Sequence, residues 1–190
     1  YSCYLRLSKL CQMNTDSQIS AVDLFCGIGG LTHGLSKEKI VVRAGYDIDE
    51  ECKFAYEKNN KSIFVAADVS ELTAADVSAH FEDGKVRLLA GCAPCQPFSS
   101  YSNRYRHAKA NRKHAADSRT DPKADNWKLL RSFLRLAREV KPELITMENV
   151  VLLQKHKVFK DFVAGLQKLD YHVTYYTVKC SDYDVPQKRR

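Results

Sequence analysis

Short apolar runs of strand length alternate with segments of helical periodicity along most of this chain. The first run, ISAVDLF, ends in the glycine turn CGIGG, and the next stretch, LTHGLSKEK, has Leu31, Gly34 and Leu35 at helical spacing. The strand-then-helix order repeats through IVVRAGYDID, EECKFAYEKNN, SIFVAADV, a helix over 71–81, VRLLAGC, the helix WKLLRSFLRLAREVK ending at Pro142, ELITMENV, KVFKDFVAGLQKL and YHVTYYTVKC. This alternation predicts an α/β, doubly wound fold with a mostly parallel sheet and helices on both faces.

The alternating pattern begins near residue 20, which sets the expected domain boundaries. Residues 1–19 show no clean period and are interpreted as an N-terminal extension, and 20–190 as one domain. No run approaches the roughly 18 apolar residues of a membrane span, and the polar N-terminal stretch lacks the apolar centre of a signal peptide. The seven cysteines have no small-scaffold spacing and fit reduced thiols. We therefore expect a soluble, cytoplasmic protein.

Four loops at predicted strand ends carry unusual residues: DLFCGIGG, GYDID, GCAPCQPFS and MENV. In a doubly wound sheet the carboxyl ends of the strands form the ligand edge, so these loops are expected to converge. The glycine turn would let a ligand approach the backbone and meet the N–H groups of a helix N-terminus. It is not a dinucleotide fingerprint, because the third glycine position is Thr32. A merely tight connection remains the alternative.

Two aspartates end the second and third predicted strands. Asp47 lies seventeen residues beyond Gly30, where a carboxylate can accept hydrogen bonds from the two hydroxyls of a ribose, and Asp68 ends the next strand. Together they indicate a nucleoside-bearing ligand. Either could instead be a helix N-cap, since helical sequence follows both.

The cysteine pair in GCAPCQPFS allows several kinds of chemistry. A structural zinc site needs four ligands, and His107 and His114 are spaced wrongly to complete one. A redox pair would favour a helix N-terminus rather than this proline-rich loop, and a zinc deaminase would need a cysteine where Phe98 stands. Cys92 is interpreted as a buried, inert thiol. Cys95 is interpreted as a partly exposed thiol whose pKa is lowered from about 8.5, with a buried, inert thiol as the alternative.

A carboxyl group and a basic segment complete the predicted site. Glu148 in MENV ends an apolar strand and is expected to be partly desolvated, so a thiolate and a proton donor would share one pocket. The net charge is +7, and lysine and arginine are concentrated between Arg104 and Lys128. This concentration favours an anionic partner, most commonly nucleic acid, although a solvated loop is the alternative.

The ordered motifs DLFCGIGG, GYDID, GCAPCQPFS, ENV and VPQKRR resemble those of the cytosine-5 DNA methyltransferases, over residues 20–190. The resemblance implies a fold of the S-adenosylmethionine-dependent methyltransferase type, with S-adenosylmethionine as methyl donor and double-stranded DNA as partner. It implies that Cys95 adds to carbon 6 of a flipped-out cytosine while Glu148 supports ring nitrogen 3. It also implies that Arg189, the first arginine of a Q-x-R-x-R motif, positions the base.

The same resemblance assigns further residues to the two ligands. The residues expected at the cofactor are Phe25, Cys26, Gly27, Ile28, Gly29, Gly30, Asp47, Ile48, Asp68 and Val69. The residues expected at the substrate are Pro94, Gln96 and Asn149, and no metal is expected. The loop from Ser99 to about Asp125 matches a loop that closes over the flipped base in this family.

Two departures from the family pattern shape the hypothesis. Cys92-Ala93 replaces the common Gly-Pro, and the chain stops inside the arginine motif, before the expected target-recognition domain. The resulting hypothesis is a catalytic-domain fragment of a bacterial restriction-modification methyltransferase, monomeric and associated with the nucleoid. A tRNA cytosine-5 methyltransferase is the second hypothesis. A cofactor- or nucleic-acid-binding module without turnover is the third.

Overall fold

The computed structural model of the chain describes residues 2–8, 19–94, 122–183 and 185, with side chains for 19–94, 128–183 and 185. The strands are β1 Ser2–Ser8, β2 Ile19–Leu24, β3 Val41–Asp47, β4 Ile63–Ala66, β5 Val86–Gly91, β6 Leu144–Val150 and β7 His172–Val178. The α-helices are α1 Gly30–Lys37, α2 Cys52–Asn59, α3 Ala74–Ser78, α5 Pro122–Val140 and α6 Lys157–Gln167, and two short 3-10 helices are η1 Val151–Lys155 and η2 Cys180–Tyr183.

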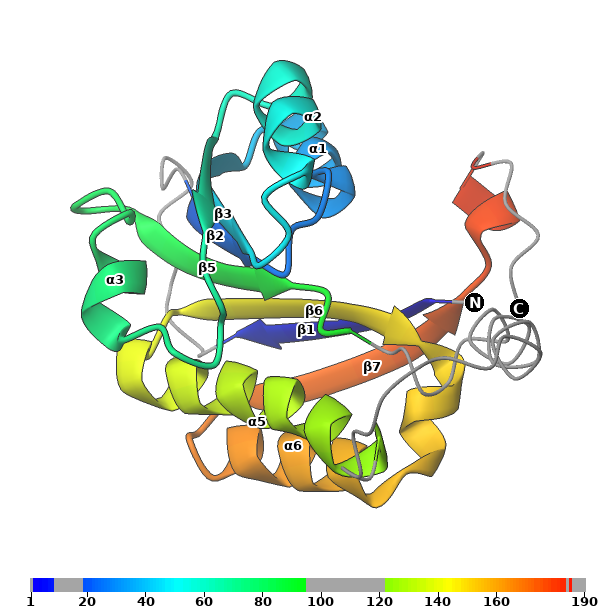
Figure 1. Cartoon of the computed structure of the whole chain (residues 1–190). Helices are drawn as coiled ribbons and strands as arrows, with labels where there is room; N and C mark the ends of the chain where they lie inside the picture. Colours follow the sequence, from blue (N-terminus) through cyan, green and yellow to red (C-terminus); the bar gives the residue numbers. More distant parts are fainter. Residues whose placement is uncertain (1, 9–18, 95–121, 184, 186–190) are drawn as a thin grey trace, which may run out of the picture.

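The seven strands form one sheet in the order β4-β3-β2-β5-β6-β1-β7 (Figure 1). The five strands from β4 to β6 in that order pair in parallel. The sixth strand, β1, is antiparallel to both of its neighbours, so β7 again runs in the direction of β6. The sheet order reverses direction after β2, which is where a doubly wound sheet opens a crevice for ligands.

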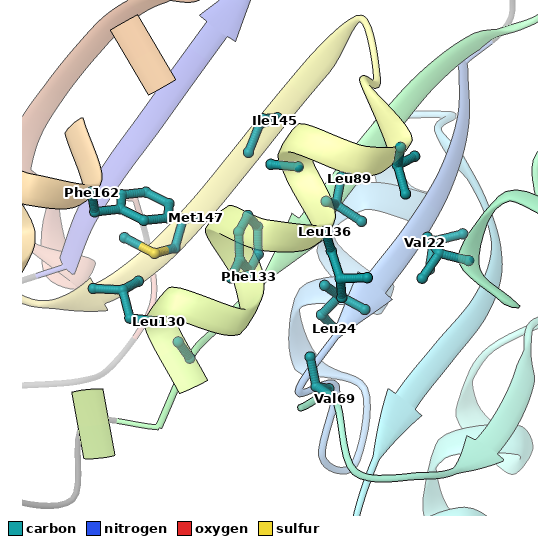
Figure 2. Close-up of a cluster of buried hydrophobic side chains, with 14 of the residues drawn as sticks. Val22, Leu24, Val69, Leu89, Leu130, Phe133, Leu136, Ile145, Met147 and Phe162 are labelled. Atoms are coloured by element: carbon teal, nitrogen blue, oxygen red, sulfur yellow. The ribbon is translucent and has the colours of Figure 1, made fainter. Parts of the chain in front are cut away.

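Helices cover both faces of the sheet, as the sequence predicts. In Figure 1, α1 and α2 lie on one side of the sheet, and α5 and α6 lie together on the other. The main core fills the α5 side, where Leu130, Phe133 and Leu136 of α5 pack toward residues of β2, β5 and β6 (Figure 2). Phe133 also makes an edge-to-face contact with Phe162 of α6, with ring centroids 5.8 Å apart. Within the described segments, no helix is both long and apolar enough to cross a membrane.

Strand β1 is the main difference from the sequence prediction, which expected no regular element in residues 1–19. Its seven residues pair along their whole length with β6 and with β7. In the chain, β1 is followed by another strand rather than by a helix. The strands that pair with it, β6 and β7, lie more than 130 residues away in the sequence. Local sequence patterns do not report pairing of this kind, because strand formation depends on neighbours that are distant in sequence.

Two helices have different limits from those predicted. The expected helix over 71–81 is only five residues long, and it begins after Thr73, whose side chain forms a capping box with Asp76. Helix α5 begins at Pro122, earlier than expected. Proline is favoured at the first helical position, because its missing N–H would have no intrahelical partner there.

Candidate functional site

The four strand ends predicted to form a site lie side by side. Leu24, at the end of β2, is paired with Tyr46 of β3 and with Gly91 of β5. Two backbone hydrogen bonds continue this pairing into the loops: Cys26 N donates to Tyr46 O at 3.0 Å, and Cys92 N donates to Leu24 O at 3.2 Å. Because β6 lies next to β5, all four loops open at one edge of the sheet.

The glycine turn between β2 and α1 depends on left-handed backbone conformations. Phe25, Gly27 and Gly29 have φ values of 59°, 50° and 90°. A Cβ atom at Gly29 would lie 2.3 Å from Asn60 Nδ2, so packing also excludes a larger residue there. No side chain caps the N-terminus of α1 at this turn. The turn therefore brings uncapped helix N–H groups to the ligand edge, as the sequence predicts.

The structure places neither Asp47 nor Asp68 at a helix N-cap, so that alternative is wrong. The N-cap residues of α2 and α3 are Glu51 and Thr73. Asp47 instead accepts from Gly27 N at 2.8 Å and from Asp49 N at 3.0 Å, which ties β3 to the glycine turn.

Asp68 accepts a hydrogen bond from Ser70 N at 2.8 Å. This backbone hydrogen bond lowers the pKa of Asp68 below its ordinary value. Its side chain is partly exposed, and it lines an open cleft of about 500 Å³. Asp68 is therefore a charged acceptor at the edge of a cavity.

The apolar residues expected at the cofactor fall into two groups. Ile28 and Ile48 are 66% and 72% exposed, so two large apolar side chains face solvent next to the glycine turn and Asp47. Cys26 and Val69 are buried instead, and burial raises the pKa of the Cys26 thiol. The exposed pair, together with the half-buried Phe25, offers apolar surface that a ligand could cover.

The second half of the candidate site joins β6 to the segment after β5. Cys92 Sγ donates to Glu148 Oε2 at 2.9 Å. Asn149, which is 3% exposed, donates from Nδ2 to Ala93 O at 2.9 Å. The prediction that Cys92 is buried is therefore wrong, since its side chain is half-buried and contacts the predicted acid. Pro94 follows, also half-buried.

Three predicted site residues lie outside the described residues: Cys95, Gln96 and Arg189. The predicted loop from Ser99 lies outside them as far as residue 121.

Sequence patterns missed a buried polar network directly beneath the glycine turn. Asp23 of β2 is fully buried, and its Oδ2 accepts from Thr32 Oγ1 at 2.7 Å. Thr32 in turn contacts the Tyr56 hydroxyl at 3.1 Å, which lies 2.9 Å from Ser62 Oγ. Burial raises the pKa of Asp23 from 3.8 to about 7, with a smaller contribution from Asp47. The sequence feature that could have indicated this network is Asp23 itself, an acidic residue inside a mostly apolar strand.

The sheet order and the glycine turn define a doubly wound α/β protein, and both strand-end aspartates lie at the edge of the sheet where such proteins bind ligands. The sequence profile of the family described as "C-5 cytosine-specific DNA methylase" matches residues 19–190. The chain belongs to this family.

Two curated relatives with similar sequences are named as type II enzymes. The type II methylase M.HgiDII of Herpetosiphon aurantiacus is 42% identical over 173 residues, covering 90% of this chain and 44% of the relative. The type II methyltransferase M.NlaX of Neisseria lactamica is 30% identical over 173 residues, covering 88% of this chain and 49% of the relative. The chain thus spans less than half the length of each of these two relatives.

Solved structures support the fold. A putative DNA modification methyltransferase encoded within an E. coli prophage superposes with a TM-score of 0.58 at 22% identity, covering 80% of this chain and 38% of the other. The S. pombe Dnmt2 methyltransferase gives a TM-score of 0.57 at 21% identity, covering 80% of this chain and 41% of the other. At these identities the likeness establishes a methyltransferase fold.

Proposed function

We propose that the protein containing this chain transfers a methyl group from S-adenosylmethionine to carbon 5 of cytosine in double-stranded DNA. The proposal rests mainly on the position of two parts of the site relative to each other. The glycine turn after β2 and the Glu148 carboxyl group on β6 lie at the same sheet edge, with only β5 between their strands. A methyl donor held at the glycine turn and a base held at Glu148 would face each other.

The residues around the glycine turn fit this methyl donor. Asp47 has lone pairs beyond those used by Gly27 N and Asp49 N, and these can accept from ribose hydroxyls. Ile28 and Ile48 offer exposed apolar surface to the rest of the nucleoside. Asp68 can accept from the adenine amino group at the edge of its cleft. S-Adenosylmethionine would supply an electrophilic methyl group on its sulfonium sulfur.

Arg135 of α5 holds the loop that follows Asp68. Its Nη2 donates to Leu72 O at 2.8 Å and to Ser70 O at 3.3 Å. We expect Arg135→Met to weaken S-adenosylmethionine binding by about 3- to 10-fold, because the loop loses two hydrogen bonds from a charged donor. Isothermal titration calorimetry measures the affinity. Arg131→Met, an exposed position one turn earlier on the helix, is the control. Equal affinities for the two variants would contradict the anchoring role.

In this proposal Cys95 and Glu148 act on the cytosine ring. The Cys95 thiolate forms a bond to carbon 6, and Glu148 donates a hydrogen bond or proton to ring nitrogen 3. The displaced electron pair makes carbon 5 nucleophilic, and carbon 5 would take the methyl group as the bond from the methyl group to the sulfonium sulfur breaks and its electron pair stays on the sulfur. A base then removes the proton from carbon 5, and the electrons of that bond expel Cys95. Covalent addition divides one difficult step into two easier ones.

The base must leave the duplex before this chemistry can occur, at a cost of a few kcal/mol. Pro94, Gln96, Asn149 and Arg189 are proposed to help hold it. Of these, Asn149 has a supporting contact: its bond to Ala93 O fixes the backbone just before Pro94. The basic residues from Arg104 to Lys128 would meet DNA phosphates. Sequence specificity would come mainly from base contacts made elsewhere in the protein.

Methyl transfer by the complete protein tests the proposal. The protein is incubated with S-adenosylmethionine labelled in its methyl group and with either duplex DNA or tRNA. We expect label in DNA, at carbon 5 of cytosine. Label in tRNA alone would favour the RNA methyltransferase instead. Calorimetric binding of S-adenosylmethionine with no label in either nucleic acid would favour a binding module without turnover.

A further inference from the structure

The thiol of Cys92 occupies a position fixed by its neighbours in the fold. Cys92 directly follows β5, and its backbone N–H extends the pairing with β2 by donating to Leu24 O. The next residue, Ala93, is held from the other side by the buried Asn149 side chain. Since the backbone is fastened on both sides, the direction of the Cys92 side chain toward β6 is set by the sheet.

The Cys92 side chain is directed toward Glu148 of β6. Gly91 is in register with Met147, so the residue after β5 lies opposite the residue after Met147. Cys92 Sγ reaches Glu148 Oε2 at 2.9 Å. The terminal torsion of a glutamate side chain has a broad, soft energy profile, so a carboxyl group has little orientation of its own. A hydrogen bond to one oxygen restricts this rotation.

We propose that Cys92 is a positioning residue for Glu148: its S–H group orients the carboxyl group that supports the cytosine ring. The proposal rests on the proposed methyltransferase function. A thiol is a weak donor, so it can orient the carboxyl group without competing strongly with a bound base for it.

Kinetics with conservative variants separate positioning from a merely structural role. We expect Cys92→Ala to slow single-turnover methyl transfer by about 3- to 10-fold while leaving the affinity for S-adenosylmethionine unchanged. Cys92→Ser, which restores a donor, should recover the rate to within about twofold. Cys52→Ala is the matched control, because Cys52 is another half-buried thiol, on α2. A Cys92→Ala rate equal to that of Cys52→Ala would overturn the proposal.

A second measurement does not depend on activity. The infrared S–H stretching band of Cys92 is identified by its loss in Cys92→Ser. In Glu148→Ala it should shift to higher frequency, because the substitution removes the acceptor of the S–H group. An unshifted band would overturn the contact even in an active enzyme. If the complete protein transferred no methyl group, the proposed function would fail, while a shifted band would still support the positioning contact.

Discussion

Glu148→Gln is expected to slow methyl transfer to DNA by about 10²- to 10⁴-fold, the usual contribution of a positioned proton donor. Glutamine preserves the shape of the side chain and can donate a hydrogen bond to ring nitrogen 3, but it carries no proton to transfer. Glu148 lies on β6, separated by β5 from the glycine turn after β2. Binding of S-adenosylmethionine should therefore be unchanged.

Single-turnover kinetics with saturating DNA and cofactor measure this effect on the chemical step. Glu38→Gln, at the exposed C-terminal end of α1, is the matched control and should keep the wild-type rate. A Glu148→Gln rate close to that of the control would show that the carboxyl group takes no part in activating the base.

Asp23→Asn is expected to stabilise the fold at pH 8 relative to wild type, and the advantage should disappear toward pH 4. Burial raises the pKa of Asp23 from 3.8 to about 7, so between these values the folded state binds a proton that the unfolded state has lost. The contribution of Asp23 to stability is thus present below pH 4 and is lost as the pH rises through about 7. At about 1.4 kcal/mol per pKa unit, this amounts to about 4 kcal/mol.

Urea denaturation of the wild type and the variant at several pH values between 4 and 8.5 measures the difference directly. Thr32→Val is an informative companion, because the Thr32 hydrogen bond to Asp23 Oδ2 lowers the Asp23 pKa and its loss should move the transition to higher pH. A difference between Asp23→Asn and wild type that is independent of pH would contradict a buried, proton-binding Asp23.

The parallel part of the fold could be predicted because its signals are local. Apolar runs such as 19–24 and 86–91 have strand length and are buried on both faces, and the glycine turn stands where β2 ends. Strand β1 could not be predicted in this way, since both of its partners are remote in the chain. The short α3 depends on the capping box between Thr73 and Asp76, which starts the helix three residues later than its apolar pattern suggests.

The site was predictable at the level of which loops meet. Strand ends of a parallel sheet share one edge, and the hydrogen bond from Gly27 N to Asp47 Oδ2 joins two of the predicted loops. The contact between Cys92 and Glu148 was not predictable, because it depends on the register of β5 against β6. Asp23 was missed for a related reason: its partner Thr32 is brought to it by the packing of α1 on the sheet.

The covalent step is the central claim, and a trapping experiment tests it most directly. The complete protein is incubated with S-adenosylmethionine and duplex DNA in which 5-fluorocytosine replaces the target base. Fluorine at carbon 5 cannot be removed as a proton is, so the enzyme should remain bound to carbon 6 through Cys95. A complex that survives denaturing electrophoresis with wild type, but not with Cys95→Ala, is the predicted result. An equal yield of that complex with Cys95→Ala, or none with an otherwise active wild type, would contradict the account.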